Sequence, residues 1–168
     1  MKPKGDRVTI LDRFKKGPAT LENVLQGLSE RELDAVPEQG GWTIRQIVHH
    51  IADGDDLWKI GIKMALGNEQ AEFRLDWYWA FSQDEWTARW AYTKRPVDKS
   101  LAFIKACRNH IMELIEHVPN AWDKSVKVPT RDGNIEIITV GAVIEMQADH
   151  VMHHVKRIKA ILAETKSV

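Results

Sequence analysis

Apolar residues recur every three or four positions along much of this chain, which is the spacing of helices that bury one face. Near the N-terminus such a face is formed by Leu21, Val24, Leu25 and Leu28. Gly17-Pro18 precedes this face, and a proline in a helix interior removes a backbone donor, although the first helical turn accepts it. The pattern therefore predicts two short helices here, over residues 8–16 and 19–28.

Three longer helices are predicted over residues 44–66, 99–117 and 140–164. The first of them begins with a capping box, in which Thr43 and Gln46 exchange side-chain and backbone hydrogen bonds. It ends before Gly67-Asn68, because glycine and asparagine commonly terminate helices. The same Ser/Thr-x-x-Glu/Gln pattern indicates two short helical segments, at residues 29–32 and 82–85.

Residues 122–139 follow a different pattern, typical of strands. Val126 and Val128 alternate with polar residues, and an Arg-Asp-Gly-Asn turn signal at residues 131–134 separates them from a group of isoleucines. This segment is expected to form a small β-hairpin. Four substantial helices, with one hairpin inserted before the last, predict an all-α four-helix bundle that occupies residues 1–168 as a single domain.

Composition narrows the choice of partners and compartment. Twenty-four Lys and Arg residues balance twenty-four Asp and Glu residues, so no basic field attracts nucleic acid or an anionic membrane. No apolar stretch approaches the roughly 20 residues of a membrane span, and the N-terminus lacks the apolar segment of a secretory signal. Cys107 is the single cysteine, which excludes an internal disulfide. We expect a cytoplasmic protein that binds neither nucleic acid nor membrane.

The histidines supply the candidate chemistry. His150 and His154 lie four residues apart on the last predicted helix, so both side chains point the same way and can chelate one ion. His50 lies three residues after Ile47, on the inward side of its helix, whereas His49 is expected at a flank. A bundle brings the middles of two helices together, so His50 is the expected third ligand. Three imidazoles leave room for water or substrate, as in catalytic sites.

Other metal and nucleotide sites are excluded by their missing motifs. The chain has no H-E-x-x-H, no Glu-x-x-His, no cysteine pair, no P-loop, no dinucleotide fingerprint and no G-x-S-x-G. His110 and His117 have no partner spacing to the other histidines, and we expect them to be structural or surface residues.

Two segments resemble a known family. Residues 40–53, Gly-Gly-Trp-Thr-Ile-Arg-Gln-Ile-Val-His-His-Ile-Ala-Asp, and residues 150–154, His-Val-Met-His-His, are similar to the DinB superfamily, in particular to its YfiT-like metal-dependent hydrolase branch. The resemblance implies a four-helix bundle, usually a homodimer, that holds one divalent ion, zinc or nickel, per chain. Carried over by position, the ligands are His50, His150 and His154, the same three that spacing indicates.

Polar residues near these histidines are candidates for supporting roles. Asp53 lies one turn after His50, and Gln147 lies one turn before His150. Either can orient a ligand imidazole or hold a metal-bound water. Asp53 is also the candidate catalytic base, which would take a proton from water or a thiol.

The aromatic residues and the cysteine have simpler interpretations. Trp42 precedes the Thr43 cap, where it is expected to pack as a hydrophobic staple. Trp86 and Trp90 are four residues apart and indicate a core or dimer contact more than a pocket wall. Cys107 is expected to be a small buried apolar residue.

The family resemblance favours a metal-dependent hydrolase that acts on a small-molecule substrate, since hydrolysis and S-transfer fit the residues equally. One alternative is a metal-dependent S-transferase that uses a low-molecular-weight thiol, because the ligand motif names the metal site and not the electrophile. Another alternative is a non-catalytic bundle that binds a metal or a partner. A site with an open coordination position that faces a solvent-connected pocket would favour an enzyme, and a closed or dry site would favour the binding module.

Overall fold

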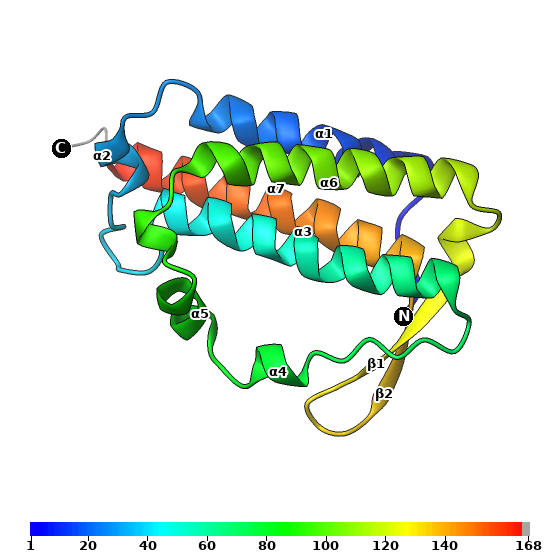
Figure 1. The fold of residues 1–168 in the computed structure, drawn as a ribbon. Helices are drawn as coiled ribbons and strands as arrows, with labels where there is room; N and C mark the ends of the chain where they lie inside the picture. The colour runs from blue at the N-terminus through cyan, green and yellow to red at the C-terminus, as the bar shows by residue number, and fades with distance from the viewer. Residues whose placement is uncertain (166–168) are drawn as a thin grey trace.

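Four long helices packed side by side form the body of the computed structural model, which describes residues 1–165 (Figure 1). They are α1 (Arg7–Leu25), α3 (Ile44–Gly67), α6 (Val97–His117) and α7 (Val140–Thr165). Helix α7 packs against α1 and α3, and α6 closes the bundle by packing against the same two helices. The predicted four-helix bundle with a hairpin before the last helix is confirmed.

Short elements connect the long helices. They are α2 (Glu30–Leu33), α4 (Asp76–Trp79), α5 (Gln83–Arg89) and two 3-10 turns, η1 (Tyr92–Lys94) and η2 (Ala121–Asp123). The three expected capping boxes are present at the starts of α2, α3 and α5, where they satisfy backbone amides that have no partner inside the helix. The α4–α5 segment lies outside the bundle, beside α3 (Figure 1). Among the described helices, none is long and apolar enough to cross a membrane.

Helix α1 continues through Gly17-Pro18, so the prediction of two short helices is wrong. Pro18 has no N–H to donate to the carbonyl of Phe14, four residues earlier. Arg108 of α6 supplies the missing donor, because its Nη1 lies 3.2 Å from the Phe14 oxygen. Gly17 makes room for this guanidinium, since a Cβ at Gly17 would lie 2.6 Å from Arg108 Nη1. A buried side chain from another helix thus replaces the backbone hydrogen bond.

Arg108 also joins the other long helices. Its Nε and Nη2 donate to the two carboxylate oxygens of Asp55 on α3, at 2.7 and 3.0 Å, and Nη2 donates to the backbone oxygen of Gln147 on α7 at 2.9 Å. Arg108 is 1% exposed and Asp55 is 4% exposed. This group, which we call the central junction (Arg108, Asp55, Phe14 O and Gln147 O), contacts all four long helices.

The expected hairpin consists of β1 (Ser125–Pro129) and β2 (Ile135–Thr139), which pair antiparallel with Val126 opposite Ile138. Val126 and Ile138 belong to the core, so one face of the hairpin packs against the bundle. The chain that follows α3 runs alongside β1, where the Phe73 amide donates to the Lys127 carbonyl at 2.7 Å. The hairpin therefore anchors one end of the α4–α5 segment.

Gly141, in the first turn of α7, lies against Trp122 at the hairpin end of the bundle, where the packing is tight. A Cβ there would lie 2.5 to 2.8 Å from three atoms of the buried Trp122 indole. We expect Gly141→Ala to lower the free energy of unfolding by about 1–3 kcal/mol, because a rigid indole must move. Urea denaturation measures the change. Gly54→Ala on α3 is the control, since its Cβ would meet no atom closer than 3.4 Å, and a similar loss there would contradict the steric explanation.

Candidate metal centre

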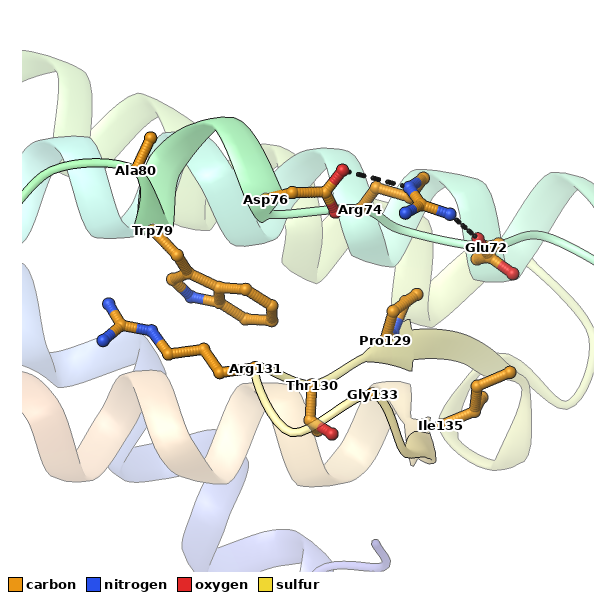
Figure 2. A pocket seen from close by; sticks show the side chains of 10 residues that line it. All are labelled: Glu72, Arg74, Asp76, Trp79, Ala80, Pro129, Thr130, Arg131, Gly133 and Ile135. Carbon is orange, nitrogen blue, oxygen red and sulfur yellow. Dashed lines mark hydrogen bonds and ion pairs between the residues drawn. The ribbon is translucent and has the colours of Figure 1, made fainter.

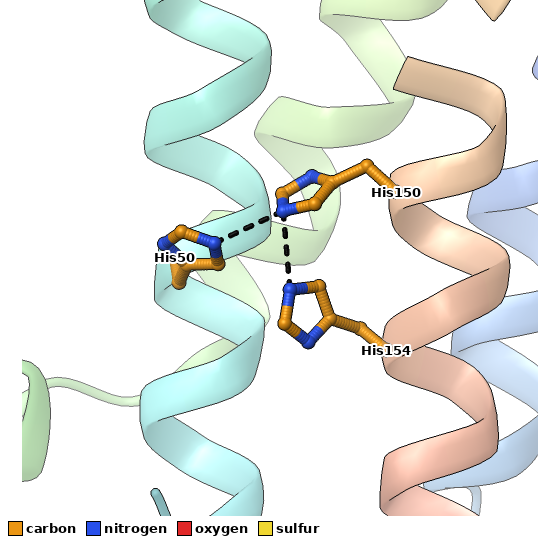
Figure 3. Close-up of side chains that lie close together, drawn as sticks. All are labelled: His50, His150 and His154. Atoms are coloured by element: carbon orange, nitrogen blue, oxygen red, sulfur yellow. Dashed lines mark hydrogen bonds between the residues drawn. The ribbon is translucent and has the colours of Figure 1, made fainter. Parts of the chain in front are cut away.

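Three histidine side chains converge between α3 and α7. His50 comes from α3, while His150 and His154 come from successive turns of α7, and the rings point toward one another (Figure 3). The Nε2 atom of His150 lies 3.0 Å from Nε2 of His50 and 3.1 Å from Nε2 of His154. One ligand atom from each residue lies within 4.8 Å of the others. Packing of α3 on α7 thus brings together the three histidines that the spacing indicates.

The site keeps these imidazoles neutral. Burial lowers the pKa of His50 to about 3, of His150 to about 4 and of His154 to about 2. The proximity of the other rings adds to this effect at His50 and His154, and the positive charge of Arg108 adds to it at His150. A neutral imidazole with a free lone pair is the form that binds a metal ion.

The geometry suits a divalent cation. Ligand nitrogens at about 2.1 Å from a tetrahedral ion are separated by about 3.4 Å, close to the Nε2 separations of 3.0 and 3.1 Å seen here. Nitrogen donors of this kind suit both zinc and nickel. His50 and His150 are half-buried, and His154 is buried. The residues present therefore fit a metal ion with at least one coordination position left open.

Asp53 lies outside this cluster, although it is only one turn along α3 from His50. Its carboxylate accepts a hydrogen bond from the Tyr92 hydroxyl in η1. Burial raises the pKa of Asp53, while the Tyr92 hydrogen bond and the nearby charge of Arg95 oppose the rise. Tyr92 was missed by sequence reasoning, because it lies 39 residues away in a turn whose position depends on tertiary packing.

His49 is buried, so the expected position at a flank of the bundle is wrong. Its Nδ1 lies 2.8 Å from the Ser100 hydroxyl oxygen, and its Nε2 lies 3.0 Å from the Arg95 carbonyl oxygen. The face of α3 that carries His49 is covered by α6, which the pattern along α3 alone does not reveal. His49 therefore has a structural role, while His110 and His117 lie at the surface as expected.

One tryptophan packs against the histidine cluster, and others form a stack on α5. The Trp42 ring packs edge-on against His50 at 4.8 Å between centroids, and its Nε1 donates to Asp84 of α5 at 2.6 Å. Trp86 is buried and stacks on Trp90 at 4.4 Å, which agrees with the core interpretation of Trp86. Trp90 also faces a recess of about 440 Å³, lined by Asp53, Asp56, Leu57, Trp77, Trp90 and Arg95.

A second recess, of about 560 Å³, lies between α4 and the hairpin turn (Figure 2). Three of its charged residues pair with one another, since Arg74 contacts Glu72 at 2.8 Å and Asp76 at 3.2 Å. Neither histidine nor cysteine is among its lining residues. Within residues 1–165, the group of side chains placed to hold a metal ion is the histidine cluster between α3 and α7.

Comparisons with known proteins agree with this picture. The DinB superfamily model matches residues 13–158. A protein of Oceanobacillus iheyensis is 28% identical over 145 residues, which cover 86% of this chain and 78% of the relative. A protein of Bacillus licheniformis is 29% identical over 148 residues, which cover 88% and 80%. Both are named "Putative metal-dependent hydrolase".

A solved structure shares the fold. YfiT from Bacillus subtilis, described as "a probable metal-dependent hydrolase with an unusual four-helix bundle topology", superposes with a TM-score of 0.82 at 22% identity. The superposition covers 99% of this chain and 94% of that one. At this identity the likeness concerns the fold alone, so the chemistry must be argued from the residues of this chain.

Proposed function

We propose that this chain, which belongs to the DinB superfamily, is a metal-dependent hydrolase that acts on a small-molecule substrate. The observation that carries the proposal is the convergence of three neutral imidazoles between α3 and α7. The names of the curated relatives support the same reaction class. His50, His150 and His154 are the residues that would hold the ion.

The protein's contribution is to keep the three ligands neutral and aimed at one point. A bound divalent ion supplies a Lewis acid that lowers the pKa of its water toward about 7. Burial removes the competing proton from each imidazole. The recess beside Asp53 has the volume of a small-ligand site, about 440 Å³, and its two indoles offer apolar walls.

Asp53 is the residue that we propose as general base. Tyr92 donates to its Oδ2, which leaves Oδ1 as the oxygen that takes a proton. Burial raises the pKa of this carboxyl and so increases its basicity toward the range that general bases use near neutral pH. Tyr92 acts as a positioning residue, because its hydroxyl holds one carboxylate oxygen and fixes the direction of the other.

Asp53→Asn is expected to retain the ion and to slow hydrolysis by about 10²–10⁴-fold, the usual contribution of a general base. A panel of small chromogenic esters and amides, assayed on the metal-loaded protein, measures the rate, and elemental analysis measures the ion. Tyr92→Phe is the matched control, since it keeps the carboxylate and loses only the positioning hydrogen bond. Unchanged hydrolysis in Asp53→Asn would remove Asp53 from the reaction.

The same assay distinguishes the alternatives. Turnover that requires an added low-molecular-weight thiol, which displaces the alcohol or amine of the substrate and yields a thioester, identifies an S-transferase. A protein that holds the ion but turns over no substrate of either kind is a binding module. The count of three histidines favours an enzyme over that module, because three ligands leave a coordination position for water or substrate.

Three further properties complete the proposal. The ion is zinc or nickel, at one per chain, because imidazole ligands suit both. The protein works as a homodimer, as the family resemblance implies. It works in the cytoplasm, a reducing compartment that a chain with a single cysteine fits. Burial raises the pKa of the Cys107 thiol to about 11, so this cysteine is not an activated nucleophile. Light scattering of the purified protein tests the dimer.

A further inference from the structure

We propose that Gln147 is a positioning residue for His150, whose Nδ1–H it holds through its side-chain oxygen. This inference rests on the proposed metal centre. According to this inference, Gln147 determines which ring nitrogen of His150 carries the proton. With Nδ1 protonated, Nε2 of His150 keeps its lone pair directed at the other two histidines.

Two buried atoms without partners point to this contact. Among the described residues, four buried side-chain nitrogen or oxygen atoms have no hydrogen-bond partner: Arg13 Nε, Gln147 Oε1, His150 Nδ1 and His154 Nδ1. Gln147 Oε1 and His150 Nδ1 come from neighbouring turns of α7; the first is an acceptor, and the second donates when it carries the ring proton. Buried polar groups are rarely left unpaired in folded proteins. A hydrogen bond between these two atoms, direct or through one water, satisfies both.

Gly54 lies beside both Gln147 Oε1 and His150 Nδ1, and its missing side chain leaves space next to them. A Cβ at Gly54 would lie 3.7 Å from Nδ1 of His150 and 4.0 Å from Oε1 of Gln147, so both atoms border the same small volume. The Gln147 amide is also oriented, since its Nε2 donates to the Gly54 carbonyl oxygen at 3.4 Å. Reversing the Gln147 amide would place its Oε1 against the Gly54 carbonyl oxygen, and both of these atoms are acceptors. Oε1 is therefore the end of the amide that is free for His150.

The central junction holds Gln147 in place. Its backbone oxygen accepts from Arg108 Nη2 at 2.9 Å, and Arg108 is bound at the same time to Asp55, the residue after Gly54. The turn of α7 that carries Gln147 is thus tied to the turn of α3 that carries Gly54. Gln147 itself is only 4% exposed, so water does not compete freely for its side chain.

The consequence concerns metal affinity. Partners that accept the second ring N–H of a ligand histidine fix its tautomer and raise its basicity, and their loss typically weakens metal binding about 10- to 100-fold. Gln147→Leu removes the acceptor with little change in volume, whereas Gln147→Glu retains an acceptor at the same place. Gln147→Leu is expected to weaken metal binding, and Gln147→Glu is expected to restore it.

The experiment measures the zinc dissociation constant of the purified full chain by competition with a chromophoric chelator. Gln147→Leu is expected to raise it about 10- to 100-fold with helical content unchanged, and Gln147→Glu to return it close to the wild-type value. Gln46→Leu is the control, because that glutamine caps α3 and makes no hydrogen bond to the cluster in the described structure. A wild-type dissociation constant in Gln147→Leu would overturn the proposal.

A second readout does not require the metal. Nitrogen-15 NMR of the metal-free wild-type protein is expected to show His150 as the Nδ1–H tautomer, and Gln147→Leu is expected to populate both tautomers. Finding the Nε2–H tautomer in the wild type would also overturn the proposal. Failure of the proposed function gives a different result. If zinc binding depends on Gln147 in this way but the protein hydrolyses no substrate, the role of Gln147 is supported and the hydrolase proposal is contradicted.

Discussion

Replacing His150 by alanine is expected to remove most of the divalent ion, which we expect at about one per chain in the wild-type protein. His150 is the central imidazole of the cluster, because its Nε2 lies 3.0 and 3.1 Å from the corresponding atoms of His50 and His154. The helices should persist, since the apolar core on either side of the site does not depend on this ring. Elemental analysis measures the ion, and circular dichroism measures the helical content.

His153→Ala is the matched control for this experiment. His153 lies on the same helix, and its ring is 5.2 Å from that of His154, but it is exposed and does not belong to the cluster. We expect it to keep the ion at wild-type stoichiometry. If His150→Ala retained the ion, or if both variants lost it equally, the assignment of the three ligands would be refuted.

Arg108→Met is expected to lower the free energy of unfolding by about 3–5 kcal/mol, the usual effect of breaking a buried ion pair. The substitution leaves the Asp55 carboxylate buried without its partner. It also removes the donor that the Phe14 carbonyl uses in place of the missing Pro18 amide, and the one bound to the Gln147 carbonyl. Urea denaturation at neutral pH measures the loss.

Arg13→Met is the control for the buried pair. Arg13 contacts Asp149 at 2.7 Å and joins α1 to α7, but the two side chains are 39% and 55% exposed, so we expect a loss of only about 0–1 kcal/mol. The double variant Asp55→Leu with Arg108→Met should recover part of the stability, because no charge is then left buried alone. Equal losses in Arg108→Met and Arg13→Met would show that the central junction contributes no more than a surface ion pair.

Much of the fold follows from local patterns in the sequence. The capping box of Thr43 with Gln46, the hairpin turn at residues 131–134 and the apolar periodicity of α3, α6 and α7 depend on neighbours a few residues away. Such interactions are readable along the chain. Helix α1 is the exception, because Gly17-Pro18 is a local break that Arg108, 94 residues from Phe14, compensates.

The candidate site also has one part that local spacing predicts and another part that depends on tertiary packing. Spacing of four residues is enough to place His150 and His154 on one face of a helix, and it makes them a candidate metal-binding pair. The meeting of His50 with His150, 100 residues apart, the bond between Tyr92 and Asp53, and the approach of Gln147 to Gly54 depend on how α3, α7 and η1 pack. Helix periodicity specifies which face is buried, but the rotation and height of one helix against another come from core packing, and these set which side chains touch.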